Sequence, residues 1–383
     1  MDFSFNQDQL LIADSAAAFL SSVSSSDSIR TSMQSEQGYD SALWTRVTQE
    51  MGWQLTHIPE AYDGLGLGYV ELCILFEQMG QHLFCAPFLS TTALAINALL
   101  VAGSDQQKTK HLANITSGDA RYTLAYSAAG RHWGVESVSA EYELCADGAV
   151  INGQYHYVVD GHTADYLIVA ARKKAATGLA LFIVPASDVE RIWTPSMDQT
   201  RKIAQVSLNK VQVASDSILM HEGEASQALS QILALSNIAI AAEQMGVAEK
   251  SLSLSVDYIA ERKQFGRVVG SFQAMKHKAA DMMTKVEAAR SAVYYAACIA
   301  DEFLQGSPLG DELEEAASIA KAYCCEAAFY NAGVALQMHG GVGFTWEYDV
   351  HLYFKRAKAA QLSFGDNAFH KERIARIALG EPL

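Results

Sequence analysis

The chain has 383 residues, of which 50% are hydrophobic, and its formal net charge is −15. This length and apolar content are sufficient for a large buried core and for two or three domains. The negative charge argues against a nucleic-acid partner, because neutralising phosphates requires clustered Lys and Arg.

The six cysteines form no CxxC pair and show no framework spacing, which indicates reduced thiols and implies no metal site. The first residues lack the basic and apolar regions of a signal peptide, and no uninterrupted apolar run reaches membrane-spanning length. We therefore expect a cytoplasmic protein without a membrane partner.

Residues 1–120 predict an N-terminal helical domain. Ser4 or Asn6 is a candidate cap for an amphipathic first helix, and the serine-rich segment 21–26 indicates a short loop. The glycine-rich segment 59–68 follows no strand, so we interpret it as a plain turn and not as a nucleotide loop. Further helices are expected at about 41–51, 69–82 and 89–102.

Residues 121–220 predict a central antiparallel β domain or barrel. The helical period gives way to short runs rich in Tyr, Val, Ile and Leu, separated by turn pairs such as Asn152-Gly153. The expected strands cover residues 122–127, 141–144, 155–159, 166–171, 179–184 and 204–213.

Residues 221–383 predict a C-terminal helical bundle domain, which makes the fold α+β and mainly α. Its first helix contains a single glycine, Gly246, and at about 1.5 Å per residue it would span roughly 60 Å. A helix this long must bury its apolar stripe in a large bundle or across subunits. The expected helices cover about 224–265, 272–305, 311–338, 348–363 and 367–379.

Two segments of this third part contain candidate binding residues. Arg262, Gln264 and Phe265 combine a charged donor, an amide and an aromatic ring, which suits a phosphorylated, planar cofactor. Arg262 could also be a solvated cation favoured by the helix dipole. Gln337 precedes Gly340 and Gly341, which allow close approach to a phosphate or adenine but could equally form a helix C-cap.

The segments Tyr258–Gly266 (YIAERKQFG) and Gln337–Thr345 (QMHGGVGFT) resemble the two C-terminal signatures of the acyl-CoA dehydrogenases. The resemblance extends over the whole order of segments. It implies that a bound FAD accepts the β hydride of an acyl-CoA thioester while a carboxylate removes the α proton. It also implies a tetramer and an electron-transfer flavoprotein or similar acceptor.

The same resemblance implies roles for the binding candidates. Arg262 would meet the pyrophosphate of the FAD bound by a neighbouring subunit, with Gln264 and Phe265 beside it. Gln337, Gly340 and Gly341 would contact the same cofactor.

The chain departs from the family pattern at two places in the expected β domain. Where the family has Thr-Glu-Pro-Gly-Ala-Gly-Ser-Asp facing the flavin, residues 127–134 are SAAGRHWG. Where the family has Trp-Ile-Thr or Trp-Ile-Ser, residues 157–159 are YVV, which keep the ring and lose the hydroxyl. Each lost polar contact would weaken flavin binding by about 1 to 3 kcal/mol.

The catalytic base also departs from the pattern. Gly365 stands at the family's usual glutamate position and Asp366 follows it, while the alternative position on the long helix holds Ser236-Asn237. Asp366 is the favoured base, although it could instead be the N-cap of the last helix. Glu243 is the second candidate, and its alternative role is a buried ion pair with a neighbouring helix. His370 is expected at the surface.

These departures resemble the partner subunits of heterotetrameric enzymes that oxidise bulky thioesters such as steroid side chains. The sequence therefore predicts an α,β-dehydrogenating enzyme that acts as a homotetramer or with a second acyl-CoA dehydrogenase chain. A redox-silent structural or acyl-CoA-binding subunit is the alternative.

Overall fold

The computed structural model describes residues 5–130 and 133–381. They form two compact units, the first from the described parts of Met1–Thr31, Tyr69–Phe84 and Asn237–Leu383, the second from Ser32–Gly68 and Cys85–Ser236. The predicted division at residues 120 and 220 follows changes in secondary structure, and as a division into domains it stays a prediction.

The predicted mainly helical fold with a central sheet is confirmed. The α-helices are α1 (Gln7–Val23), α2 (Ser26–Gln34), α3 (Ser41–Gln49), α4 (Tyr69–Gln81), α5 (Asn97–Ala102), α6 (Asp105–Thr116), α7 (Ala225–Glu261), α8 (Gln273–Leu304), α9 (Leu313–His339), α10 (Val350–Leu362) and α11 (Asn367–Leu379). A π-helix covers Leu89–Ile96. Short 3-10 helices cover Trp53–Leu55, Glu60–Tyr62, Val135–Ser137, Ala186–Asp188, Ser215–Ser217, Val269–Ser271, Pro308–Glu312 and Gly340–Phe344.

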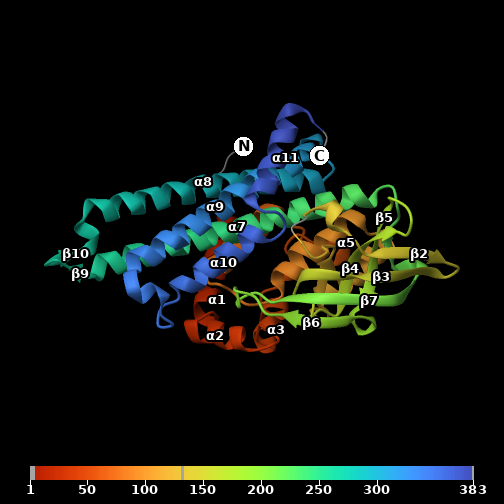
Figure 1. Cartoon of the computed structure of the whole chain (residues 1–383), viewed down its shortest axis with the longest axis horizontal. Coiled ribbons are helices and arrows are strands. Elements are labelled where there is room, and N and C mark those ends of the chain that lie inside the picture. Colours follow the sequence, from red (N-terminus) through yellow and green to blue (C-terminus); the bar gives the residue numbers. More distant parts are fainter. Residues whose placement is uncertain (1–4, 131–132, 382–383) are drawn as a thin grey trace. The chain divides into compact units, whose positions relative to one another are not determined.

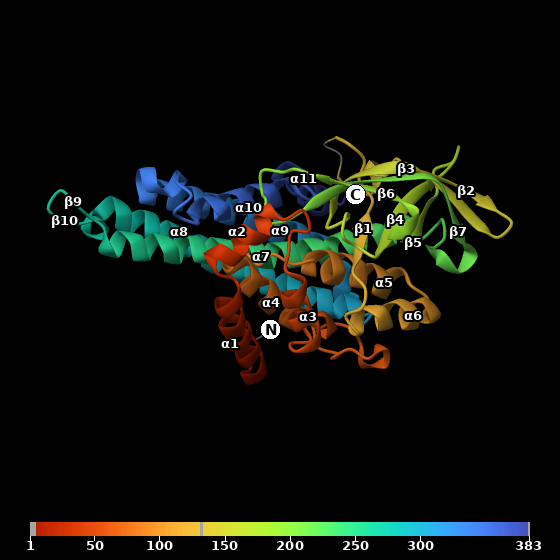
Figure 2. The ribbon, with the colours of Figure 1, turned by 90° about the horizontal axis from the view of Figure 1, so that it is seen from below.

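In the first unit, the long helices α7, α8 and α9 run side by side in both views of the ribbon (Figures 1 and 2). Helix α9 packs against α8, α10 and α11, and α4 packs against α1 and α8. Helix α7 is long and apolar enough to cross a membrane, but 78% of its most apolar stretch is buried, which is the pattern of a core helix.

Helix α7 ends at Glu261, earlier than predicted, and the chain continues as a hairpin of β9 (Lys263–Gln264) and β10 (Arg267–Val268). The two residues between these strands, Phe265 and Gly266, have φ of 53° and 77°. A two-residue turn with both φ positive matches the twist of a hairpin and cannot continue a helix. In Figure 1 the hairpin lies at the end of α7 and α8 that is far from α11.

The second unit contains an eight-stranded sheet in the order β6-β7-β3-β2-β4-β5-β8, with β1 paired to β4. This path is open, so the sheet is not a closed barrel. Strand β4 pairs in parallel with β1 and β2, and the remaining pairs are antiparallel. The strands are β1 (Tyr122–Ala125), β2 (Glu141–Cys145), β3 (Gly148–Val159), β4 (Tyr166–Lys173), β5 (Leu179–Pro185), β6 (Glu190–Thr194), β7 (Ile203–Ala214) and β8 (Ile218–Met220).

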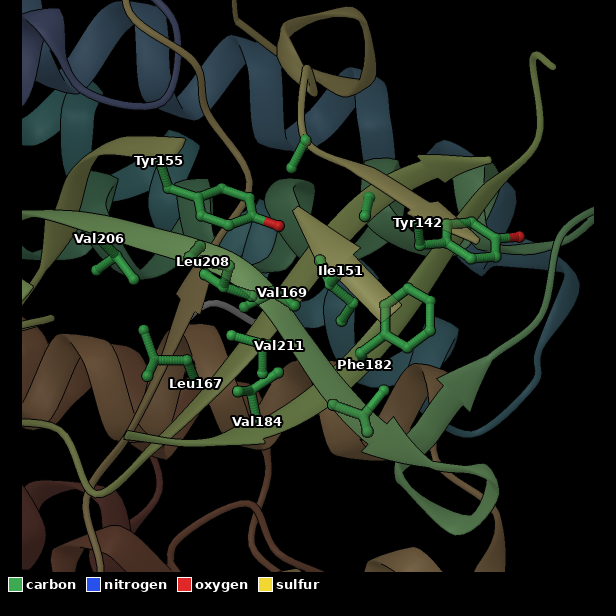
Figure 3. Close-up of a cluster of buried hydrophobic side chains, with 14 of the residues drawn as sticks. Tyr142, Ile151, Tyr155, Leu167, Val169, Phe182, Val184, Val206, Leu208 and Val211 are labelled. Carbon is green, nitrogen blue, oxygen red and sulfur yellow. The ribbon is translucent and has the colours of Figure 1, made fainter. Parts of the chain in front are cut away.

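The core of this unit is a cluster of buried side chains on the strands, including Tyr142, Ile151, Tyr155 and Phe182 (Figure 3). The rings of Tyr142 and Phe182 meet edge to face at 5.0 Å. Alternating residues of β7 enter this cluster, as expected for a strand with one buried face. Only the second half of β3 was predicted, and the predicted turn at Asn152-Gly153 is wrong, because these residues lie within β3 where its pairing with β7 shifts register.

The sequence did not predict α2, α6, β6 or β8. The serine-rich segment is only a brief interruption, because α1 extends to Val23 and α2 begins at Ser26. Helix α6 begins with a capping box formed by Ser104 and Gln107, a signal that was present in the sequence and was overlooked.

Candidate cofactor and acyl-CoA site

The hairpin after α7 is an exposed cationic projection. Arg262 is exposed, and no carboxylate among the described residues pairs with its guanidinium. The ring of Phe265 is 90% exposed. Gln264 is exposed as well, and its side-chain amide donates to the neighbouring carbonyl of Lys263, at 2.9 Å. Thus all three predicted residues present their side chains to the surroundings.

The glycines after α9 form an open turn. Gly340, with φ of 63°, ends the helix by donating its N–H to the carbonyl of Gln337. A Cβ added at Gly340 or Gly341 would meet nothing within 4 Å, whereas one at Gly343 would lie 3.0 Å from the carbonyl oxygen of Leu336. Gly340 and Gly341 therefore expose bare backbone, while Gly343 is needed for packing.

The hairpin and the glycine turn lie at the same end of the bundle. Ile259, Met282 and Met338 share one buried cluster. The rings of Tyr258 and His339 stack with their centroids 4.3 Å apart. These contacts join the last turn of α7, the first half of α8 and the last turn of α9, so the structure brings the two sequence motifs together.

This end of the bundle carries a concentration of positive charge in an acidic chain. Lys278 Nζ lies 2.8 Å from Gln337 Oε1, and Arg267 lies over the ring of Phe272 at 3.9 Å. An exposed guanidinium at the same end of the bundle as bare glycine backbone fits an anionic, phosphorylated ligand, because charge-assisted hydrogen bonds and close backbone approach are both available. The donor set is therefore compatible with the pyrophosphate of FAD.

The segment before α11 contains Asp366, the favoured base. Asp366 is half-buried and caps α11, since its Oδ1 accepts the N–H of Phe369 at 3.0 Å. Gly365 has φ of 109°, and a Cβ there would lie 2.6 Å from both His370 Nε2 and Phe369 Cδ1. A side chain at the family's usual base position is thus excluded by the present conformation.

Glu243 lies in a different environment. It is 2% exposed, and its Oε1 accepts a hydrogen bond from Arg356 Nη1 at 2.7 Å. Arg356, on α10, is itself fully buried. The structure therefore places Glu243 in the buried ion pair that was its alternative role.

His370 is buried, so the expectation of a surface position is wrong. Burial, assisted by the positive charge of Lys321, lowers the pKa of His370 to about 3. The imidazole is consequently neutral near pH 7, and its Nε2 lies 3.2 Å from the carbonyl oxygen of Phe364. The surface position was expected because histidine is a polar residue, whereas in the structure His370 lies on the inner face of α11.

The family's alternative base position also holds hydrogen-bonding side chains. In the second unit, Ser236 Oγ lies 2.7 Å from the carbonyl oxygens of Ala93 and Ile232. In the first unit, Asn237 Nδ2 donates to the carbonyl of Phe364 at 3.4 Å. Neither residue supplies a carboxylate.

The two β-domain segments that depart from the family lie together in the second unit. His156 N–H donates to the carbonyl of Ser127 at 2.9 Å, and Tyr157 follows with φ of 59°. The pairing of β3 with β7 shifts register between Tyr155 and Val158, so Tyr157 lies on a bulge with an exposed ring. Residues 131 and 132 of the eroded motif lie outside the described residues.

Comparisons with known proteins agree with this architecture. The chain matches the acyl-CoA dehydrogenase N-terminal domain over residues 6–119 and the C-terminal domain over residues 225–379. It is 30% identical to acyl-CoA dehydrogenase IpdE2 of Mycolicibacterium smegmatis over 358 residues, covering 93% of this chain and 94% of that one.

Two solved structures have the same fold over nearly their whole length. A chain from the ChsE4-ChsE5 complex of Mycobacterium tuberculosis has a TM-score of 0.88 and 25% identity, covering 100% of both chains. A chain from a structure of the electron transferring flavoprotein of Acidaminococcus fermentans has a TM-score of 0.90 and 28% identity, covering 99% of this chain and 100% of that one.

The fold defines a class of mainly helical proteins with an inserted β-sheet, and the cationic end of the bundle is compatible with a phosphorylated ligand. Within that class, the chain belongs to the acyl-CoA dehydrogenase family. It is an oxidoreductase that acts on the CH–CH group of an acyl-CoA thioester.

Proposed function

We propose that this chain is an FAD-dependent subunit of a tetrameric acyl-CoA dehydrogenase and binds the FAD of an adjacent subunit through its hairpin and glycine turn. The observation that carries the proposal is the exposed guanidinium of Arg262, which has no carboxylate partner among the described residues and lies at the same end of the bundle as Gly340 and Gly341. Arginine in such a setting binds a diphosphate through two parallel charge-assisted hydrogen bonds.

The other residues of this end have complementary roles. Phe265 offers an exposed ring for the flat, apolar surface of the cofactor, and Gln264 and Gln337 offer amides for its polar edges. When bound, FAD accepts the hydride that leaves the β carbon of the thioester.

Proton removal from the α carbon is assigned to Asp366. One carboxylate oxygen is held by the N–H of Phe369, whereas Oδ2 has no hydrogen-bond partner among the described residues. The N–H groups in the first turn of α11 place partial positive charge beside this carboxylate, which suits a group that accepts a proton.

A second acyl-CoA dehydrogenase chain is proposed as the partner that completes the tetramer. The flavin-facing segments of this chain depart from the family pattern, and one structural relative is a complex of two different proteins. We further propose a bulky, ring-containing acyl-CoA as substrate, an electron-transfer flavoprotein or similar acceptor, and a cytoplasmic location.

A redox-silent partner subunit is the second candidate function. Three observations favour it: Gly365 leaves no room for a side chain, Glu243 is paired with buried Arg356, and Ser236-Asn237 provides no carboxylate. In that case the partner chain removes the α proton, while the binding of its FAD by Arg262 is unchanged.

The proposal is tested by FAD binding to the purified oligomer, followed through flavin absorbance at about 450 nm. Arg262→Ala should weaken FAD binding by about 2 to 4 kcal/mol, or roughly 30-fold to 1,000-fold in Kd. Arg376→Ala is the matched control, because that arginine pairs with Glu372 on the surface of α11, away from both motifs. An unchanged FAD dissociation constant in Arg262→Ala would remove this residue from the site.

A further inference from the structure

The first unit contains a buried lysine that has no carboxylate partner among the described residues. Lys321, on α9, is 1% exposed, and its Nζ donates to the carbonyl oxygens of Ala360 and Gly365, both at 3.0 Å. Removing an ammonium from water is expensive unless its charge is used by the groups around it. The contacts with these two carbonyl groups must therefore offset the cost of burying the ammonium.

The segment that Lys321 contacts has an unfavourable backbone conformation. Phe364 and Gly365 both have positive φ, 57° and 109°. For Phe364 this conformation is sterically costly, and such residues persist only where the surrounding structure holds them in place. The turn between α10 and α11 therefore keeps this conformation because neighbouring residues hold it, and not because its own backbone favours it.

Two more buried side chains hold the same turn. His370 Nε2 and Asn237 Nδ2 lie 3.2 Å and 3.4 Å from the carbonyl oxygen of Phe364. Donors from α7, α9 and α11 thus fix two successive carbonyl groups. Because each peptide unit is planar, fixing these oxygens also fixes the following N–H groups and the direction in which Asp366 leaves the backbone.

A purely structural role for Lys321 would be to cap the end of α10. Ala360 lies in the last turn of that helix, and a lysine near a helix C-terminus satisfies its free carbonyls. However, Gly365 lies beyond α10, and its peptide unit carries the N–H of Asp366. The ammonium polarises that peptide unit through a charge-assisted hydrogen bond, which a cap of α10 does not need.

We propose that Lys321 is a positioning residue for the dehydrogenation, because it holds Gly365 and Asp366 in the one orientation that faces the acyl thioester. This inference rests on the proposed function, in which the turn before α11 lies beside the α carbon. Lys321 itself touches neither substrate nor cofactor.

The test compares Lys321→Met and Lys321→Gln with the wild-type oligomer. Methionine keeps the apolar stem of Lys321, and glutamine keeps one donor while removing the charge. If one of the two variants fails to fold, the other still tests the proposal. Lys358→Met is the matched control, since Lys358 Nζ donates to Gln361 on the same helix, α10. Cyclohexanecarboxyl-CoA is the probe, and bound FAD, kcat, KM and the probe's Kd are measured for each protein.

With turnover normalised to bound FAD, kcat should fall about 10- to 100-fold, as expected for a reacting group displaced by roughly 1 Å. KM should change by less than about three-fold, FAD affinity should stay at the wild-type value, and Lys321→Arg should restore part of kcat. Unchanged kcat in both neutral variants would overturn the proposal. A loss explained entirely by lower FAD content would also overturn it.

The outcome remains decisive if the wild-type chain binds the probe without turning it over. In that case no proton is removed for Lys321 to position, so binding without turnover by the FAD-loaded wild-type oligomer rejects the role of Lys321 alone and leaves the proposed binding of acyl-CoA intact. If the wild-type chain does not bind the probe, the proposed function is rejected together with the role of Lys321.

Discussion

Replacing Gly246 by alanine should destabilise the first unit, although the same change stabilises most helices. Gly246 is the glycine of α7, and a Cβ added there would lie 1.9 Å from the carbonyl oxygen of Glu77 on α4. The contact is reciprocal, since a Cβ at Gly80 would lie 2.0 Å from the carbonyl oxygen of Glu243. The two helices therefore touch backbone to backbone.

The size of the destabilisation depends on how far α4 and α7 must separate. Real Cβ atoms approach other atoms no closer than 3.0 Å, so α4 and α7 must part by 3.0 − 1.9 = 1.1 Å at this contact. Overpacking of this kind costs about 1 to 3 kcal/mol, and more where backbone has to move. Alanine gains only about 1 kcal/mol in helix propensity over glycine. Because the clash here is with backbone, the steric cost lies at or above the upper end of this range, and the net loss is about 2 kcal/mol or more.

The assay is urea unfolding of the purified protein, followed by circular dichroism, with Gly333→Ala as the matched control. Gly333 lies within α9, and its added Cβ would have Phe354 as nearest neighbour at an ordinary 3.7 Å. The control should be neutral or stabilised by up to about 1 kcal/mol. A Gly246→Ala variant as stable as the wild type would refute the backbone contact.

Three further predictions concern acidic side chains. Burial raises the pKa of Asp301 from 3.8 to about 6 even though its carboxylate caps α4 at the N–H of Tyr69. A pKa that is raised in the folded state stabilises the protein fully below pH 4, and this contribution is lost as the pH rises through 6. The unfolding free energy of the wild type should therefore fall by about 3 kcal/mol over this range, and Asp301→Asn should remove that fall. Glu243→Gln should cost about 3 to 5 kcal/mol by removing the carboxylate charge that faces buried Arg356, and the double change of both residues to leucine should recover much of that loss in urea unfolding. Asp366→Asn keeps much of the helix cap and should abolish kcat if Asp366 is the base; full kcat in this variant and in Glu243→Gln would assign proton removal to a partner chain.

Much of the fold could be predicted because hydrophobic period and turn chemistry are local. Helices α8 and α9 repeat apolar residues at helical spacing over many turns, and their ends were predicted to within two residues. The end of α7 was misplaced because nothing in the composition around Phe265 shows that this residue adopts positive φ. Strand β6 was missed because most of its residues stay partly exposed, which weakens the apolar alternation.

The residues proposed to bind FAD were better predicted from the sequence than the residues around the proposed catalytic base. Arg262, Gln264 and Gly340 stand in short motifs whose chemistry is visible in one segment of sequence, and the structure brings these segments together. The roles of Lys321 and His370 depend instead on which carbonyl groups a distant turn presents. No local sequence pattern shows which carbonyl groups these side chains contact, although the single lysine in the alanine-rich sequence of α9 marks an unusual position.

The two candidate carboxylates show how tertiary contacts decide between chemically equal residues. The sequence could not show which of the two carboxylates is paired with a cation, because the arginine that pairs with Glu243 lies 113 residues away. To reach a substrate, Glu243 would have to break its buried ion pair with Arg356, which costs several kcal/mol before any chemistry occurs. Asp366 meets no such penalty, because it is half-buried and one of its oxygens has no partner among the described residues. A carboxylate that removes a proton must be reachable as well as ionised, and this requirement favours Asp366 over Glu243 independently of any family pattern.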